Sequence, residues 1–226
     1  MNDEIVRLSP SSLGLLLDCP RCFWLRFRAG HERPRGIFPS LPGAMDRVIK
    51  AYFDRYRGSL PPELEGRVDG VLMEDQATLD LWRNWKTGLR FVDEELGVEL
   101  SGALDDCLRD GEVYLPLDYK TRGSAPRPGT PWYYRYQLNL YSLLLNENGY
   151  QTDSRGYLVY YFPQVVKEAG AVTFHVHPQR IETSLEDAQA LLRTASEVLS
   201  GEIPDPAPEC EYCRWQALDP ESEFAI

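Results

Sequence analysis

The stretch LPLDYKTRG (residues 115–123) places an aspartate and a lysine two positions apart in a run that otherwise resembles a half-buried strand. Apolar or aromatic side chains occupy every second position from residue 113 to residue 119. Because side chains alternate along a strand, Asp118 and Lys120 are predicted to lie together on the opposite face. The residues Arg109, Asp110 and Gly111 form a turn signal, so we expect a β-hairpin with the preceding run, residues 98–106.

The preceding run carries Asp105, which this hairpin would bring beside Asp118 and Lys120. Two carboxylates and an ammonium would then lie at one place. Proteins hold Mg²⁺ with one or two carboxylates together with water and phosphate oxygens. Such an ion acidifies a water, and a nearby lysine can offset the charge that grows on a phosphoryl group. The spacing alone slightly favours a simpler explanation, an exposed ion pair between strands, over a metal site. Such a pair contributes only about 0–1 kcal/mol.

The rest of the chain shows signals for further helices and strands. We expect helices over residues 9–30 (in two pieces divided at Pro20), 43–57, 79–89, 130–149 and 184–200. Further strands are expected over residues 156–162 and 171–177, and a proline-rich loop bearing the last cysteines follows residue 201. The helix over 43–57 has an apolar stripe of Met45, Val48, Ile49, Tyr52, Phe53 and Tyr56. This order predicts a single α/β or α+β domain.

Three segments in this order resemble the motifs of the PD-(D/E)XK nuclease superfamily: GALDD (102–106), LDYKT (117–121) and QLNLY (137–141). The likeness is strongest to the RecB-like and CRISPR-associated exonuclease branch. It implies an α/β fold of the restriction-endonuclease type, with a mixed central sheet flanked by helices. It implies that Asp105 and Asp118 bind Mg²⁺ or Mn²⁺, that Lys120 is the catalytic lysine, and that Gln137 and Tyr141 line the site.

Helical spacing supports the last pair independently, because residues four apart share one face of a helix. Core packing would equally explain Tyr141, and a solvated helix face would explain Gln137. The family also has an acidic residue or a histidine on an early helix, and in GAMD (43–46) Asp46 takes that position as a third candidate metal ligand. A surface charge explains Asp46 as well. Glu99 is a further candidate ligand or an exposed hairpin charge.

Four cysteines form two C-x-x-C pairs, Cys19 with Cys22 and Cys210 with Cys213. This spacing delivers two thiolates to one metal, and four thiolates suit Zn²⁺ or an iron–sulfur cluster. A metal would therefore join the N-terminal helices (9–30) to the C-terminal tail (202–216) in a cysteine lobe of one domain, 1–226. The resembled branch holds a [4Fe-4S] cluster, which we expect by analogy, whereas the spacing favours zinc. The branch's last ligand would fall on Asp219, so Cys22 is expected to replace it.

Composition limits the classes of function. Hydrophobic residues make up 43% of the chain, which predicts a folded core. The net charge of −11 argues against charge-driven binding to a polyanion, although a bound metal can reverse the field inside a site. We find no run of about 20 apolar residues and no apolar signal core near Met1, and expect a cytoplasmic protein without membrane contact.

We therefore expect a nuclease that acts on DNA, and by resemblance an exonuclease on single-stranded ends with partners in a DNA-processing or defence complex. The competing reading is a non-catalytic nucleic-acid-binding or scaffold protein with a structural metal. Arg122 and Arg127, in the loop after Lys120, are candidate phosphate contacts. His175 and His177 alternate along a strand, and we interpret them as ordinary strand residues without a metal.

Overall fold

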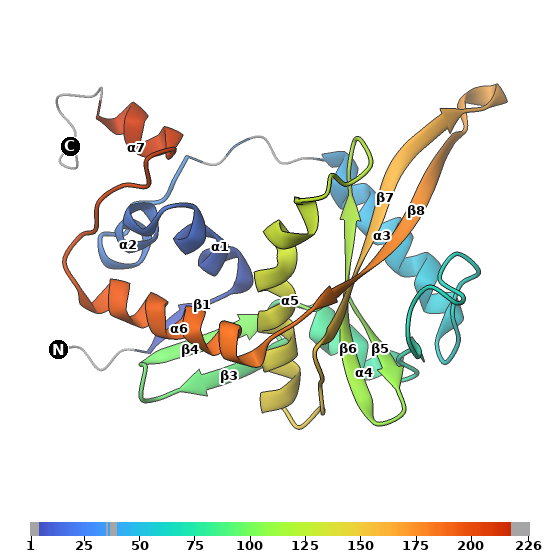
Figure 1. Cartoon of the computed structure of the whole chain (residues 1–226), viewed down its shortest axis with the longest axis horizontal. Helices are drawn as coiled ribbons and strands as arrows, with labels where there is room; N and C mark the ends of the chain where they lie inside the picture. The colour runs from blue at the N-terminus through green and yellow to red at the C-terminus, as the bar shows by residue number, and fades with distance from the viewer. Residues whose placement is uncertain (1–4, 35, 37–39, 218–226) are drawn as a thin grey trace. The chain divides into compact units, whose positions relative to one another are not determined.

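The computed structural model describes residues 5–34, 36 and 40–217 (Figure 1). The helices are α1 (Pro10–Asp18), α2 (Pro20–Arg28), α3 (Ser40–Phe53), α4 (Gln76–Arg83), α5 (Thr130–Glu147), α6 (Leu185–Ser200) and α7 (Glu211–Gln216). The strands are β1 (Val6–Leu8), β2 (Val71–Leu72), β3 (Leu89–Asp93), β4 (Val98–Gly102), β5 (Asp106–Asp110), β6 (Val113–Thr121), β7 (Arg155–Val166) and β8 (Val172–Glu182). Helices and strands mix along the chain, which confirms the predicted α/β class.

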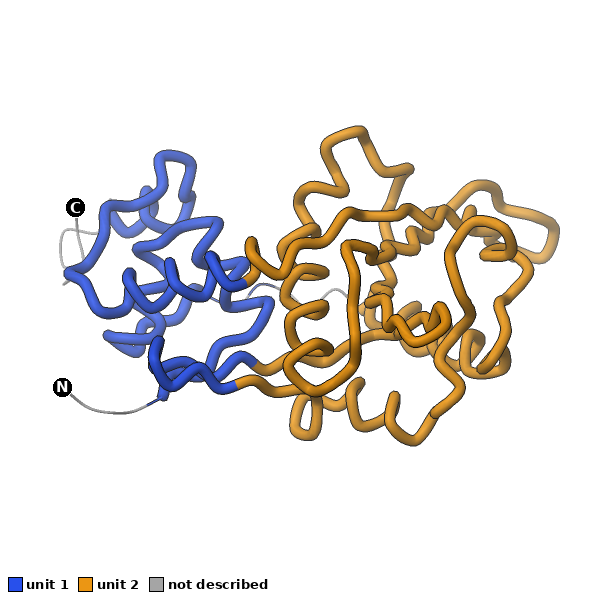
Figure 2. Tube along the Cα trace, turned by 60° about the horizontal axis from the view of Figure 1, so that its bottom comes forward, with its two compact units in different colours: residues 1–37, 92–100, 189–226 blue, residues 38–91, 101–188 orange. Residues whose placement is uncertain are grey.

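The chain divides into two compact units (Figure 2). The first contains residues 1–37, 92–100 and 189–226, and the second contains residues 38–91 and 101–188. The segments expected to form a cysteine lobe, 9–30 and 202–216, fall in the first unit. The organisation as one nuclease domain with such a lobe stays a prediction.

The second unit is built on a five-stranded sheet in the order β2-β5-β6-β7-β8. Strands β5 and β6 form a hairpin at the predicted turn, with β5 in place of the strand expected over residues 98–106. Strands β6 and β7 are parallel, and β7 and β8 are antiparallel. A parallel pair requires a crossover, and α5 lies between β6 and β7 in the chain and packs on both. A core cluster on one face joins α3 to the sheet, and its buried members are Ile49, Phe53, Leu64, Leu72, Leu108, Leu115, Leu117, Tyr119, Tyr157, Val159 and Tyr161.

Strand β5 stops short of the end of its partner. The last register pair is Asp106 with Leu117, whereas β6 continues to Thr121 in contact with β7. The two strands therefore open a fork, and one edge of β6 from Asp118 onward is not paired to β5. This fork positions the candidate site.

The first unit holds α1 and α2, which begin as the sequence predicts. Ser9 caps α1 through a hydrogen bond from the Ser12 backbone, and Pro10 occupies the first turn. Pro20 opens α2 directly after α1. Figure 1 shows α7, near the other end of the chain, beside these two helices. No helix in the described ranges combines the length and the hydrophobicity that crossing a membrane would need.

The structure corrects several local predictions. Residues 98–106 do not form one strand: β4 ends at Gly102 and belongs to a second sheet, in the order β1-β4-β3, so Asp105 lies on the connection to β5. Glu99 lies on β4 in that second sheet, and its carboxylate is 3.6 Å from Arg7 Nε. The helix expected over 79–89 ends at Arg83, because the amides of Thr87 and Gly88 turn back onto the carbonyl of residue 84.

Exposure and one further helix also differ from expectation. Trp85 is 75% exposed and Val48 is 65% exposed, so neither belongs to the core-facing stripe of its predicted helix. The C-terminal tail is not all loop, because the short helix α7 begins directly after Cys210. Asp219, the position of the branch's last ligand, lies outside the described residues.

Candidate active site and cysteine centre

The fork between β5 and β6 brings the predicted acidic residues and lysine together. Lys120 Nζ forms an ion pair with Asp118 Oδ2, and both side chains project from the same face of β6. Asp105 Oδ2 accepts a 3.3 Å hydrogen bond from the backbone amide of Tyr119. Asp105 is thereby held against the unpaired edge of β6, beside Asp118.

Gln137 and Tyr141, one turn apart on α5, complete the arrangement. Gln137 Nε2 donates to Asp118 Oδ1 at 3.0 Å, and Lys120 Nζ donates to Gln137 Oε1 at 3.0 Å. The Gln137 side-chain amide therefore hydrogen-bonds both Asp118 and Lys120 and fixes their relative position. Gln137 Nε2 also donates to the Tyr141 hydroxyl at 2.9 Å, and that hydroxyl donates to the Ala103 carbonyl at 3.0 Å. Tyr141 therefore connects α5 to the segment that carries Asp105.

A second lysine, which sequence reasoning missed, lies on the other side of Asp105. Lys50 Nζ is 2.7 Å from Asp105 Oδ1 and 3.0 Å from both carboxylate oxygens of Asp46. Lys50 follows Asp46 by four residues on α3, a spacing that predicts this ion pair and could have identified it. The structure brings Asp46 to the site through Lys50.

A buried ion-pair network lies directly after Asp105 in the chain. Asp106 is fully buried and receives two 2.7 Å hydrogen bonds from Arg57 and one of 3.0 Å from Arg83. The Tyr119 hydroxyl donates to the same carboxylate at 2.6 Å. Arg83 Nε also donates to the Asp105 carbonyl at 2.8 Å. Of the two adjacent aspartates, only Asp105 has its carboxylate directed to the fork, and the network holds its backbone in place.

Burial governs the ionisation of the groups in the fork. Burial raises the pKa of Asp118 to about 7, although the nearby Lys120 lowers it, and the charge of Asp105 raises it further. Burial likewise raises the pKa of the Tyr141 hydroxyl well above its usual value. Asp118 therefore takes up a proton at a higher pH than an ordinary aspartate, while Tyr141 stays a hydroxyl that can donate.

The donors in the fork suit a hard divalent cation. Asp105 and Asp118 supply carboxylate oxygens at the unpaired edge of β6, whereas Asp46 is joined to Asp105 only through the Lys50 ammonium. In the described part of the chain, the cysteines alone form a set of three or more ligating side chains whose atoms all lie within 4.8 Å of one another. The carboxylates are less tightly gathered, so water and substrate oxygens would complete the coordination of an ion, as is usual for Mg²⁺.

The four predicted cysteines form a compact buried centre. The Sγ atoms of Cys22 and Cys210 are 3.6 Å apart, as are those of Cys22 and Cys213, and Cys19 and Cys213 are 3.8 Å apart. Arg33 Nη2 donates to Cys210 Sγ at 3.5 Å. These residues fit a metal with four thiolate ligands. Cys107, which belongs to neither C-x-x-C pair, is fully buried on β5.

The thiols of this centre differ in acidity. Burial raises the pKa of Cys22 to about 11, although a hydrogen bond from Arg33 opposes the rise. For Cys210, burial is outweighed by hydrogen bonds from the backbone and side chain of Cys213, and the pKa falls to about 7. Cys210 is therefore the thiol of these two that loses its proton first.

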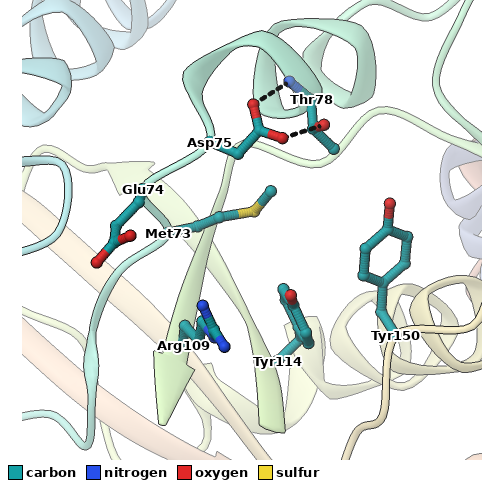
Figure 3. A pocket seen from close by; sticks show the side chains of 7 residues that line it. All are labelled: Met73, Glu74, Asp75, Thr78, Arg109, Tyr114 and Tyr150. Atoms are coloured by element: carbon teal, nitrogen blue, oxygen red, sulfur yellow. Dashed lines mark hydrogen bonds between the residues drawn. The ribbon is translucent and has the colours of Figure 1, made fainter. Parts of the chain in front are cut away.

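A separate hollow of about 150 Å³ lies beside the start of α4 (Figure 3). Its lining includes Arg109, Tyr114 and Tyr150, and its Asp75 carboxylate caps α4 by accepting from the Thr78 amide at 3.0 Å. None of the residues that converge in the fork lines this hollow, so it is not part of the candidate active site.

Comparison with known proteins gives one family. Residues 41–218 match the family model described as "PD-(D/E)XK nuclease superfamily". The matched range contains the fork, α5 and two of the four cysteines. Its mixed sheets flanked by helices agree with the restriction-endonuclease-like fold expected from the motifs. No curated protein matches the chain.

Proposed function

Because the chain belongs to the PD-(D/E)XK nuclease superfamily, we propose that it is a metal-dependent nuclease with its active site in the fork between β5 and β6. The observation that carries this proposal is the convergence there of Asp105, Asp118, Lys120 and Gln137. We further propose that the substrate is DNA, that the ion is Mg²⁺ or Mn²⁺, and that cleavage starts at single-stranded ends. These finer statements rest on the resemblance to the exonuclease branch.

Each residue in the fork has a distinct task in this proposal. Asp105 and Asp118 would hold a divalent ion, which would supply Lewis acidity to the phosphodiester and lower the pKa of a bound water. The Lys120 ammonium, paired with Asp118, offsets negative charge on the phosphoryl oxygens. Gln137 hydrogen-bonds both Lys120 and Asp118 and so fixes the position of the ammonium relative to the carboxylate. Asp46 is a third candidate ligand by resemblance to the family motif, and in this structure its carboxylate pairs with Lys50, which also pairs with Asp105.

The experiment is a cleavage assay with Mg²⁺ or Mn²⁺ on linear single-stranded, linear duplex and circular single-stranded DNA. An exonuclease degrades the linear strand and leaves the circle intact. Lys120→Ala and Asp118→Asn are each expected to lower the rate by about 10²–10³-fold, as when a preorganised electrostatic group is removed. Lys86→Ala, which truncates an exposed lysine outside the fork, serves as the matched control.

The alternative outcomes are distinct. Cleavage that survives both Lys120→Ala and Asp118→Asn contradicts the assignment of the site. DNA binding without any cleavage, unchanged by chelators, indicates the non-catalytic binding protein instead. Cleavage of the circle with the same rate as the linear strand indicates an endonuclease.

For the cysteine centre, we propose one zinc ion in preference to a [4Fe-4S] cluster. In a tetrahedral site with Zn–S bonds of about 2.3 Å, the thiolate sulfurs lie about 3.8 Å apart. Three of the Sγ–Sγ separations are 3.6 to 3.8 Å, which agrees with that value, and all four sulfurs lie within 4.8 Å of one another. A cluster of four irons and four sulfides would occupy the space between the thiolates and hold them further apart.

Metal analysis of anaerobically purified protein tests this proposal. We expect colourless protein with one zinc per chain and no iron or labile sulfide. Cys22→Ser is expected to lower the zinc content sharply, whereas Cys107→Ser, at the cysteine outside the centre, should leave it unchanged. A brown protein with iron and labile sulfide would support the cluster and contradict zinc.

A further inference from the structure

One face of the β7–β8 hairpin carries a row of aromatic rings that begins beside the candidate active site. Lys120 on β6 is the register partner of Tyr160 on β7. Tyr160 is in turn the partner of His177, and Phe162 is the partner of His175. Because directly paired residues, and residues two apart on one strand, share a face of the sheet, all five side chains lie on one face.

The four rings form a continuous row, which we call the aromatic strip (Tyr160, Phe162, His175 and His177). Ring centroids of Tyr160 and His177 are 6.5 Å apart, those of His177 and His175 are 6.4 Å apart, and those of His175 and Phe162 are 5.0 Å apart. Tyr160 is buried, whereas the other three rings are only partly buried.

The strip extends past the end of β6. The last register pair between β6 and β7 joins Thr121 to Tyr161, so Phe162 and His175 lie beyond it. Figure 1 shows β7 and β8 continuing well past the end of β6. The partly buried rings of Phe162 and His175 therefore lie further from Lys120 along the hairpin than Tyr160 and His177 do.

Two polar groups beside the strip lack partners. The Tyr160 hydroxyl and the Arg122 Nε are buried, and the described residues offer neither of them a hydrogen-bond partner. Arg122 follows Lys120 by two residues and acts electrostatically on the Tyr160 hydroxyl. No carboxylate in the described ranges forms an ion pair with Arg122. Buried polar groups are normally satisfied, so a donor and a hydroxyl left without partners point to a ligand that bonds them.

We propose that the aromatic strip and Arg122 form a binding subsite for an unpaired nucleic-acid strand, with bases stacked on Phe162 and His175 and a phosphate on Arg122. This inference rests on the proposed function, because it takes the fork as the place of cleavage. It assigns a role to His175 and His177, which the sequence presents as ordinary strand residues.

The chemistry of the strip favours an unpaired strand over a duplex. Aromatic side chains bind single strands by stacking on exposed base faces, whereas the bases of a duplex already stack on one another. The net charge of −11 opposes binding through many phosphate contacts. A subsite with few cations and several rings instead draws its affinity from stacking, which is largely insensitive to salt.

The test measures binding of a fluorescent 12-nucleotide strand and of a duplex of equal length, in buffer without added divalent ions. Phe162→Ala and His175→Ala are each expected to weaken single-strand binding by about 5- to 140-fold, the range for loss of one base–aromatic stack. Phe162→Trp, which retains a stacking ring, should bind nearly as well as the wild type. Val172→Ala truncates an exposed side chain on the opposite face of the hairpin and should change nothing.

Hydrolysis of methyl 4-nitrophenyl phosphate, which is too small to span the fork and the strip, separates this proposal from the proposed function. The strip variants should hydrolyse it at the wild-type rate. If the wild type hydrolyses it and the strip variants bind the single strand normally, the strip proposal is overturned. It is also overturned if the wild type binds the duplex more tightly than the single strand. If the wild type hydrolyses no phosphodiester but the variants lose single-strand binding, the strip stands and the proposed function fails.

Discussion

The buried carboxylate of Asp106 offers the sharpest test of how the site is supported. In Asp106→Asn the side chain keeps its shape and loses its charge. The native carboxylate accepts two hydrogen bonds from Arg57, one from Arg83, one from the Tyr119 hydroxyl and one from the Cys107 amide. The variant removes the buried carboxylate shared by two arginines, whose side chains are 9% and 11% exposed.

The expected cost follows from that burial. Removing one partner of a buried ion pair typically lowers the free energy of unfolding by about 3–5 kcal/mol. For a chain of this size, 1 kcal/mol corresponds to a shift of about 2–4 °C in the melting temperature. We therefore expect Asp106→Asn to melt about 6–20 °C below the wild type. The remaining carboxylate of the network, Asp54, is 30% exposed and still pairs with both arginines, which favours the lower half of the range.

Urea unfolding followed by tryptophan fluorescence, in buffer that contains no chelator, measures the change in the free energy of unfolding. Asp80→Asn is the matched control, because that carboxylate is 63% exposed and lies 4.0 Å from Arg83, so its loss should cost less than about 0.5 kcal/mol. Asp105→Asn should abolish cleavage while changing stability little. An Asp106→Asn protein within 1 kcal/mol of the wild type would refute the argument that the network holds the fork together.

Three further predictions concern other parts of the chain. Gly102→Ala should lower the free energy of unfolding by about 1–3 kcal/mol in urea titrations, because the new methyl would lie 2.6 Å from a leucine methyl of α5. Asp69 has a pKa lowered by hydrogen bonds from Tyr157 and Arg155. Asp69→Asn should therefore lose about 0–1 kcal/mol at pH 7. Its difference from the wild type should begin to shrink as the pH falls below the usual aspartate value of about 3.9 and vanish only below the lowered pKa of the folded state, measured by paired unfolding at pH 7 and at successively lower pH. Arg33→Ala should weaken zinc binding about 10- to 100-fold in competition with a chromophoric chelator, because it removes a hydrogen bond to a ligating thiolate.

Local signals in the sequence predicted a large part of the fold. The cap at Ser9, the restart at Pro20 and the turn before Val113 all depend on neighbouring residues, and the structure has each of them. The pairing of Gln137 with Tyr141 likewise follows from helical spacing. These features are local, so a pattern of a few residues suffices to predict them.

The predictions that were wrong depended on partners distant in the chain. Alternation could not reveal that β4 ends at Gly102 and pairs in a different sheet from β5, because strand partners are not encoded in the strand's own period. Trp85 fits a helical stripe, yet the helix ends before it. The pairing of Asp106 with Arg57 joins residues 49 positions apart, and nothing in either segment specifies the other.

The cysteine centre has a consequence for the order of events during synthesis. Its ligands come from Cys19 and Cys22 early in the chain and from Cys210 and Cys213, more than 180 residues later. The complete set of thiols can therefore assemble only after residue 213 has emerged from the ribosome, when every strand of the five-stranded sheet has already been translated. A nascent chain interrupted between residues 183 and 209 would carry the whole fork but lack two of the four cysteines, so a metal held by all four would be bound only after the sheet is complete.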